Sequence, residues 1–323
     1  MQAIRLHTFG PAENLTHEPV DAPSPAPGQI RIAVAAAGVH LLDTVLRRGE
    51  RGPLPALPPL PTIPGREVAG VVESLGDGVA GLWLGKRVVA HLGLAPGGYA
   101  ELAVVDVDRV HEIPANLDFA QAVAMIGTGR TAMGIVQFSE LDGDSVVVVP
   151  AAAGGLGTLL VQYATHAGAT VVGLAGGPDK AALARANGAD LAVDYTEPEW
   201  PGKVRAWLGG RHATVVFDGV GGAVARQAVD LLGPNGRHIV FGWSSGQPYT
   251  RETAGVSEQV LGPVMMRKAG GPSPIRTLEL RALAEAAEGR LTPTVQRFPL
   301  AAAADAHRAL ETRKTAGKVV LEP

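Results

Sequence analysis

The sequence contains no cysteine, few aromatic residues and no long basic run. Without cysteine among its 323 residues, the chain can form neither disulfide bonds nor a catalytic thiolate. Aromatic residues make up only 4%, whereas 42 glycines and 25 prolines favour many tight turns. The formal net charge is −3, so the basic footprint of a nucleic-acid binding protein is missing. We therefore expect no nucleic-acid partner.

Long apolar segments are missing as well. The chain has no uninterrupted run of about 20 apolar residues, the length needed to span a bilayer. The N-terminus lacks the apolar core of a signal peptide. Hydrophobic residues still make up 46% of the chain and charged residues 18%, which suffices for packed cores. This length favours two domains. We expect a soluble, cytoplasmic protein that does not bind a membrane.

The segment Ser145–Gln162 is the most informative part of the chain. A run of valines ends in a cluster of alanines and glycines, and an apolar helical pattern follows at once. Small residues let the backbone approach a pyrophosphate, and the start of the helix offers free N–H groups to that anion. The cluster alone would indicate only a tight turn, but its position between strand and helix favours a dinucleotide site. The residues expected to bind the cofactor here are Ala153, Gly154, Gly155, Leu156 and Gly157.

Hydrophobic patterning divides the chain into two domains. Residues 1–122 are rich in strand patterns, interrupted by the proline-rich loop Gly52–Pro64. Residues 123–268 alternate strands (145–150, 170–175, 189–193, 213–217 and 238–241) with helices (156–167, 179–187 and 222–232), which predicts a doubly wound parallel sheet. Residues 269–323 break this rhythm and are expected to return to the first domain, with helices at 276–288 and 301–312 and strands at 294–298 and 318–321.

Several motifs together resemble the medium-chain dehydrogenase/reductase superfamily, in particular its zinc-free quinone oxidoreductase (zeta-crystallin-like) branch. They are Ala36–Thr44, Pro64–Val72, Gly97–Glu101, Ala151–Gly157, Asp218–Gly221, Phe241–Gly246 and Gly317–Leu321. The resemblance implies an α/β fold in which a GroES-like β-barrel catalytic domain is joined to a Rossmann domain. It places the active site in the cleft between the two domains.

The residues that match the zinc ligands of related alcohol dehydrogenases do not suit a metal. These positions hold His40, Arg66 and, with a less secure match, Ala124. An arginine has no lone pair to donate, and one imidazole cannot replace about three protein ligands. We expect a metal-free enzyme. Because it would lack a Lewis acid, quinones or carbon–carbon double bonds conjugated to a carbonyl are the expected hydride acceptors.

The end of the second Rossmann strand favours NADPH over NADH. Enzymes selective for NAD carry a carboxylate there, whereas this chain has Ala175 and Gly176. By resemblance, Gly176, Lys180 and Tyr195 hold the 2′-phosphate. Two alternatives stay open: Lys180 could be an ordinary solvated helix residue, and Asp179 could still reach the ribose.

The resemblance also assigns residues at the nicotinamide end. Thr128 and Thr131 match positions that contact the nicotinamide, although threonines there could simply cap a helix. The ends of two parallel strands supply Val220, Phe241, Gly242 and Trp243, because ligands bind at the carboxyl edge of such sheets. Lys318 resembles a basic residue that approaches the pyrophosphate, or it could be a solvated lysine.

No general acid stands out in the sequence. His40, Asp43 and Thr128 are the candidate catalytic residues, and His40 or Asp43 could relay a proton. Alternatively, the two side chains could bond to each other and only shape the cleft. Tyr99 is expected to pack between domains, and Arg66 to orient Glu67 or reach the cleft.

Three functions are compatible with these features. The first is an NADPH-dependent reductase of quinones or activated enones. The second is an enoyl or alkenal reductase of a biosynthetic pathway. The third is a non-catalytic NADPH-binding protein, as some crystallins are. By resemblance the chain forms a homodimer, for which Gln259–Met266 could supply an edge strand.

Overall fold

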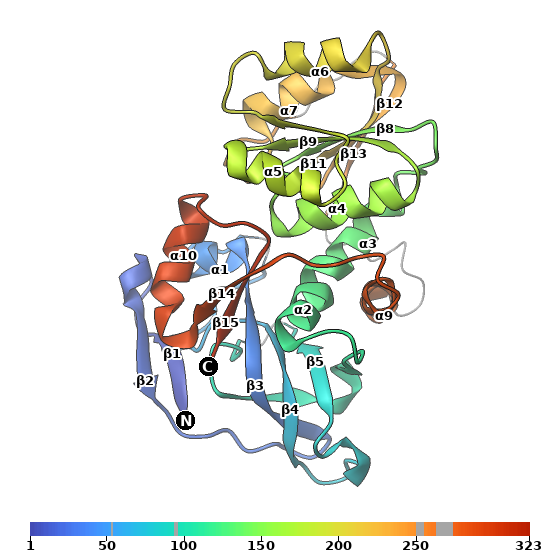
Figure 1. Ribbon diagram of the computed structural model, residues 1–323. Coiled ribbons are helices and arrows are strands. Elements are labelled where there is room, and N and C mark those ends of the chain that lie inside the picture. The colour runs from blue at the N-terminus through green and yellow to red at the C-terminus, as the bar shows by residue number, and fades with distance from the viewer. Residues whose placement is uncertain (53, 94–95, 250–254, 263–273) are drawn as a thin grey trace. The chain divides into compact units, whose positions relative to one another are not determined.

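The computed structural model describes residues 1–52, 54–93, 96–249, 255–262 and 274–323. Contacts divide the chain into two units, whose helices and strands are labelled in Figure 1. The first unit consists of Met1–Thr128 and Thr294–Pro323, and the second of Gly129–Pro293. Among the described residues, no helix has the length and apolarity needed to cross a membrane.

A mixed β-sheet forms the core of the first unit. Its strand order is β14-β15-β3-β4-β5-β7, with β6 also paired to β3 and a separate β1–β2 ribbon beside it. The strands are β1 Gln2–Leu6, β2 Leu15–Pro19, β3 Gln29–Val39, β4 Glu67–Leu75, β5 Arg87–His91, β6 Leu102–Asp106, β7 Val110–Glu112, β14 Val295–Pro299 and β15 Lys318–Glu322. Strand β3 alternates buried and half-buried residues in its first half and is almost fully buried in its second. A sheet covered on one face at one end and on both faces at the other produces this pattern.

Helices of the first unit are short. They are α1 Leu41–Arg47, α2 Phe119–Ala124 and α10 Ala303–Glu311, with 3₁₀ turns η1 Ala12–Asn14, η2 Gly81–Trp83, η3 Val107–Arg109 and η5 Leu300–Ala302. Helix α2 begins with Asp118, which accepts a hydrogen bond from the Gln121 backbone N–H at 2.7 Å and thereby caps the helix. After α2 the chain passes through a π-helical turn, η4 Met125–Gly129, into α3 Arg130–Val136 of the second unit. Such turns are often found at functional sites.

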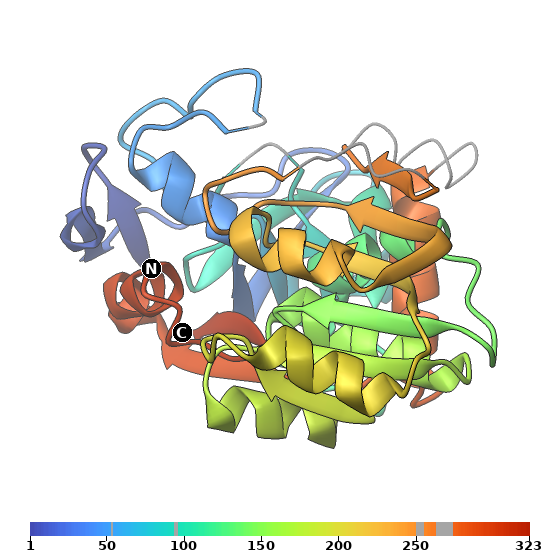
Figure 2. The same cartoon turned by 90° about the horizontal axis from the view of Figure 1, so that it is seen from above.

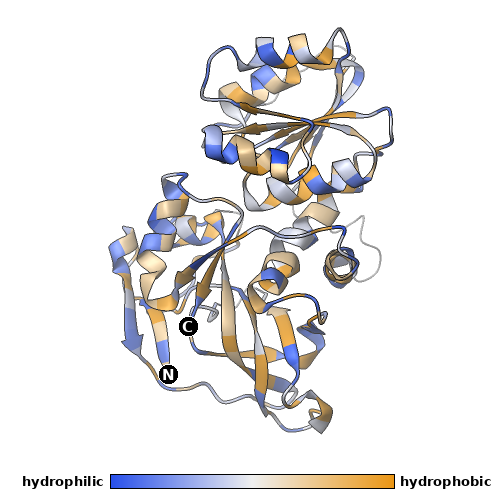
Figure 3. Cartoon of the chain, viewed as in Figure 1, coloured by the Kyte–Doolittle hydropathy of each residue, from blue (hydrophilic) through white to orange (hydrophobic). Residues whose placement is uncertain are grey.

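The second unit contains a six-stranded parallel sheet of order β10-β9-β8-β11-β12-β13. Its strands are β8 Val146–Pro150, β9 Thr170–Ala175, β10 Leu191–Asp194, β11 Ala213–Asp218, β12 Leu232–Val240 and β13 Ser257–Val260. Helices α4 Gly155–His166 and α5 Pro178–Ala186 cover one face, and α6 Trp200–Leu208 and α7 Gly222–Val229 cover the other (Figures 1 and 2). Apolar residues gather on the strands (Figure 3), and all of β8 is buried. The predicted doubly wound parallel sheet is confirmed.

Two features of the second unit differ from the sequence-based expectation. Helix α6 was not among the predicted helices; Pro201 lies in its first turn, where a missing N–H costs nothing. Helix α9 Pro274–Ala287 was assigned to the first domain, yet it packs on α3. Arg130 Nη1 lies 2.9 Å from Glu279 Oε1 across this contact. The boundary between the units therefore lies after Pro293 rather than after 268, and the earlier boundary lies after Thr128 rather than after 122.

Candidate active site

The glycine-rich turn after β8 has the geometry expected of a dinucleotide site. Ala151 has a positive φ of 52°, and α4 begins directly after Gly154. A Cβ on Gly157 would overlap the carbonyl oxygen of Ala151, so only glycine allows the helix to pack this closely on the strand. The N–H groups of the first turn of α4 are available to an anion. The predicted cofactor residues 153–157 all lie in this turn, and they suit a pyrophosphate.

The residues predicted to select the phosphate come together at the end of β9. A Cβ on Gly176 would lie 3.1 Å from the hydroxyl oxygen of Tyr195, and Lys180 lies in the first turn of α5. The sequence analysis did not consider Asp194, which ends β10 opposite Ala175. Its Oδ1 accepts hydrogen bonds from the N–H of Gly177 at 2.9 Å and from the hydroxyl of Thr196 at 2.7 Å.

These hydrogen bonds affect the charge beside the predicted phosphate site. The bond from Gly177, followed by those from Thr196, lowers the pKa of the Asp194 carboxyl. A carboxylate is therefore present near the predicted phosphate position, but on the neighbouring strand. Because its negative charge opposes that of a phosphate, geometry alone does not choose between the two nicotinamide dinucleotides.

The carboxyl ends of β11 and β12 bring together the predicted residues Val220, Phe241, Gly242 and Trp243. Asp218 Oδ1 accepts hydrogen bonds from the N–H groups of Val220 and Gly221 at 2.8 and 2.9 Å, which shapes the turn after β11. The Phe241 ring occupies the space that a side chain on residue 219 would need. Trp243 is 52% exposed within the chain. This edge thus offers a backbone turn and an aromatic surface.

Thr128 and Thr131 are not N-cap residues. Thr128 is buried inside the π-helical turn, and Thr131 is the second residue of α3, which follows Gly129. The alternative interpretation, that these threonines cap a helix, is therefore wrong. Their contact with a nicotinamide stays a prediction.

Three charged side chains form what we call the ionic cluster: His40, Glu67 and Lys318. Lys318 Nζ lies 2.8 Å from Glu67 Oε2 and 2.9 Å from His40 Nε2. The same His40 nitrogen lies 2.5 Å from Glu67 Oε1. Glu67 is fully buried and Lys318 is 5% exposed, whereas the His40 side chain is 29% exposed. One imidazole nitrogen thus lies within hydrogen-bond distance of both an ammonium and a carboxylate.

Glycines at two positions make room for the Glu67 carboxylate. A Cβ on Gly38 or on Gly127 would overlap the Glu67 carboxylate oxygens, so β3 and the π-helical turn can approach it only without side chains. Burial tends to raise the pKa of Glu67, but the charges of His40 and Lys318 outweigh it and hold the pKa well below its usual value. Glu67 is therefore an anion at neutral pH.

The ionic cluster changes the interpretation of Lys318. The sequence analysis offered pyrophosphate binding or a solvated lysine. The structure excludes the solvated lysine, since the side chain is buried and paired with Glu67. Contact with a pyrophosphate stays untested and would require Lys318 to leave these partners. The relation between Lys318 and Glu67, 251 residues apart, was not visible in the sequence.

A second buried network lies on the other side of α1. Asp43 Oδ2 accepts hydrogen bonds from the backbone N–H of His40 at 2.8 Å and from the Tyr99 hydroxyl at 3.0 Å. The same hydroxyl lies 3.2 Å from His307 Nε2. Burial, followed by the charge of Asp43, raises the pKa of Tyr99 well above its usual value. Tyr99 therefore does more than fill space: it joins Asp43 to His307.

Two hydrogen bonds link Asp43 and His40: the His40 N–H donates to Asp43 Oδ2, and the Asp43 N–H donates to the His40 carbonyl oxygen at 3.0 Å. The alternative bond between the two side chains is not among the contacts of the described residues. Arg66 approaches Asp43 rather than Glu67, with Nη2 3.9 Å from Asp43 Oδ1. Among the described residues, no group of three His, Asp or Glu side chains could hold a metal ion. Next to His40 stands the cation of Lys318, which would repel a metal. Metal independence remains a prediction, and this donor set supports it.

Comparisons with known proteins cover the whole chain. Residues 26–115 match the alcohol dehydrogenase GroES-like domain family and residues 155–268 the zinc-binding dehydrogenase family. A quinone oxidoreductase of Pseudomonas aeruginosa is 33% identical, covering 99% of each chain. A 2-haloacrylate reductase of a Burkholderia species is 32% identical, covering 100% of this chain and 99% of its own.

Two solved structures cover this chain fully. The Escherichia coli quinone oxidoreductase, in complex with NADPH, is 28% identical with a TM-score of 0.85, and all of its chain is covered. A protein described as an NAD-dependent alcohol dehydrogenase is 31% identical with a TM-score of 0.87, again with all of its chain covered. The expected GroES-like and Rossmann-type fold is confirmed. One of these two structures is described with NADPH and the other with NAD. Near Gly176, this chain has both a cation, Lys180, and a carboxylate, Asp194.

Proposed function

This chain belongs to the medium-chain dehydrogenase/reductase superfamily and is a quinone oxidoreductase-like enzyme of it, and from that premise we propose an NADPH-dependent, metal-independent reductase of quinones or activated α,β-unsaturated carbonyl compounds. The observation that carries the proposal is the ionic cluster. In this cluster, Lys318 and the buried Glu67 both contact His40. His40 stands at a position that matches a zinc ligand in related alcohol dehydrogenases.

Several residues would hold the cofactor. The turn 153–157 suits the pyrophosphate, and Lys180 with Tyr195 suits a 2′-phosphate. When bound, a reduced nicotinamide supplies the hydride. The carboxylate of Asp194 weakens the case for a phosphate, whereas Lys180 strengthens it. We favour NADPH, and the relative solved with NADPH supports that choice.

His40 is the best placed proton donor. Reduction of an enone or quinone needs one proton for each hydride, delivered to carbon or oxygen of the acceptor. His40 is partly exposed, and its Nε2 lies beside Lys318 and Glu67. In this proposal the imidazole gives a proton to the acceptor, and Lys318 and Glu67 hold the ring in place. Thr128 and Asp43 would position the reactants rather than donate.

Reduction of an enoyl or alkenal substrate is the alternative. It uses the same fold, cofactor and proton requirement, and the relative described as a 2-haloacrylate reductase favours it. A non-catalytic role, in which NADPH binds without turnover, is the third possibility. We also propose a homodimer, because β13 is the terminal strand of its sheet and could pair with a second copy. Within Gln259–Met266, residues 263–266 lie outside the described residues.

A turnover panel tests the function. Purified protein is mixed with NADPH or NADH and with benzoquinones, naphthoquinones, alkenals and enones, and loss of absorbance at the reduced-cofactor band is followed. We expect NADPH oxidation with at least one quinone or enone, without added metal and unaffected by a chelator. Tight NADPH binding with no turnover across the panel would support the non-catalytic role instead.

A further inference from the structure

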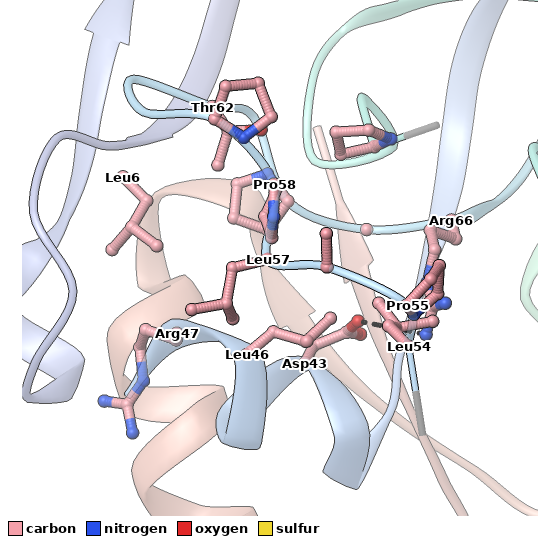
Figure 4. Close-up of a pocket in the computed structure, with 15 residues that line it drawn as sticks. Leu6, Asp43, Leu46, Arg47, Leu54, Pro55, Leu57, Pro58, Thr62 and Arg66 are labelled. Atoms are coloured by element: carbon pink, nitrogen blue, oxygen red, sulfur yellow. Dashed lines mark ion pairs between the residues drawn. The ribbon is translucent and has the colours of Figure 1, made fainter. Parts of the chain in front are cut away.

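The first unit contains a cavity of about 200 Å³, to which the proposed function assigns no ligand. It lies between α1, the end of β1 and the proline-rich loop (Figure 4). Most of its lining is apolar: Leu6, Leu46, Leu54, Pro55, Ala56, Leu57, Pro58, Pro59, Pro64 and Pro96. An engineered cavity of about 150 Å³ accepts benzene, so this volume suits one ring or a short chain.

Three charged side chains, Asp43, Arg47 and Arg66, also line the cavity, together with Thr62 and Gly65. Figure 4 shows Asp43 and Arg66 pointing toward each other beside Leu54 and Pro55. Their closest approach is 3.9 Å, too long for a hydrogen bond. Arg47 is 2% exposed and pairs through Nη2 with Glu311, which also binds Arg48. The lining thus carries two cations and one anion.

Both arginines have unused hydrogen-bond donors. Within the part of the chain that the structure describes, the buried Nε of Arg66 and the buried Nε and Nη1 of Arg47 have no hydrogen-bond partner. A buried N–H without a partner is destabilising, because it has lost its hydrogen bonds to water without replacing them. Burial, opposed by Glu311, lowers the pKa of Arg47, consistent with an incompletely compensated cation. A ligand with a negatively charged oxygen would satisfy these donors.

We propose that this cavity binds a small apolar acceptor that carries a carboxylate, such as a short or single-ring α,β-unsaturated acid, with the carboxylate paired to Arg66. The planar guanidinium matches a carboxylate better than a neutral carbonyl oxygen does. A quinone without an acidic group would offer these donors only neutral carbonyl oxygens.

For turnover, this inference rests on the proposed function. The hydride of the reduced nicotinamide would form a C–H bond at the β-carbon while the carbon–carbon π bond breaks. A proton would then form the C–H bond at the α-carbon, which leaves the saturated acid and the oxidised cofactor. Arg66 would offset the negative charge that develops on the carboxylate side of the acceptor.

Binding of unreactive probes tests the cavity without turnover. Benzoate and benzamide have nearly the same shape but differ in charge, and calorimetry measures both in the full-length protein. We expect benzoate to bind at least about 10-fold tighter than benzamide, and Arg66→Gln to reduce that preference to less than about 3-fold. Arg66→Lys should retain part of it. The matched control is Arg31→Gln, at a half-buried arginine paired with Glu73 outside the cavity, and it should retain all of this preference.

Two further measurements fix the location and the link to catalysis. Leu57→Trp, which fills the cavity, should abolish binding of both probes while the melting temperature stays near that of the wild type. In the NADPH assay, Arg66→Gln should lower the ratio of kcat/KM for cinnamate to that for benzoquinone at least about 10-fold, mainly through the KM for cinnamate. A benzoate preference that is absent, or that survives Arg66→Gln, overturns the inference even if quinones are reduced. Absence of all turnover overturns the proposed function, and the probe experiment still decides the cavity.

Discussion

Opposite features fix the geometry of the glycine-rich turn in the second unit and of the ionic cluster in the first unit. The turn consists of consecutive residues, 151–157, and depends on missing side chains, since a Cβ on Gly157 would overlap the backbone of Ala151. The cluster joins residues 40, 67 and 318 and depends on complementary charges in a buried space. Local backbone geometry defines the first, whereas mutual compensation of distant charges defines the second.

This difference predicts where each region is sensitive. A glycine turn tolerates changes of charge nearby but not added volume. A buried charge cluster tolerates little removal of charge, because the remaining partner is left without compensation in a poorly solvated space. The four predictions below test this contrast, beginning with the largest effect.

Removal of Glu67 should have the largest effect on stability. Glu67→Ala leaves the buried Lys318 ammonium without its anion, which should lower the free energy of unfolding by about 3–5 kcal/mol, measured by urea denaturation. The control is Glu73→Ala, which breaks the exposed pair with Arg31 and should cost about 0–1 kcal/mol. Equal losses of unfolding free energy in the two variants would show that the buried ionic cluster stabilises the protein no more than an exposed ion pair does.

The second buried network should make stability depend on pH. Burial, opposed by Asp43, lowers the pKa of His307 to about 4 from 6.5. Between these values the unfolded chain binds a proton that the folded chain does not, so stability is complete above pH 6.5 and falls as the pH drops toward 4. The full loss is about 3 kcal/mol.

Denaturation at several pH values tests this contribution. His307→Gln cannot titrate, so its stability should fall less steeply between pH 6.5 and 4, by about 1.4 kcal/mol per pH unit. His17→Gln, at an exposed strand position, should keep the wild-type slope. An unchanged slope in His307→Gln would contradict the assignment of a neutral buried His307.

Added volume should damage the glycine turn. Gly157→Ala forces α4 away from β8, which should cost about 1–3 kcal/mol and raise the Kd for NADPH about 10-fold or more. Gly202→Ala in α6, where a Cβ meets nothing within 4 Å, is the control and should instead stabilise by about 0.5–1 kcal/mol. If both substitutions behave alike, close packing is not the reason for glycine at 157.

A change of charge beside the turn should have the smallest effect. Lys180→Ala should raise the Kd for NADPH about 10-fold, equivalent to about 1.4 kcal/mol. The Kd for NADH should stay nearly the same. Lys203→Ala, which removes the exposed partner of Glu197, is the matched control. Equal losses for both cofactors would mean that Lys180 does not recognise the 2′-phosphate.

Local signals explain which parts of the site could be predicted. The turn 151–157, the strand ends at Val220 and Trp243, and the Gly176–Tyr195 pair follow from strand–helix order, because the carboxyl ends of parallel strands meet at one edge. Helix α9 was predicted at 276–288, but its unit and the domain boundary could not be predicted, since they depend on packing against α3. Asp194 was missed because its importance comes from the neighbouring strand, not from its own segment.

By itself, the sequence determined the doubly wound parallel sheet and the dinucleotide turn, since both depend on residue types at short spacing. The GroES-like domain and the mismatch with a zinc site followed from the resemblance to the family. Only the tertiary structure decided how the charges pair. Lys318 became the buried partner of Glu67 and His40, and Asp43 was bonded to Tyr99 and approached by Arg66. The reason is physical: the energy of a buried charge depends on what surrounds it in space, and those neighbours come from strands far apart in the chain.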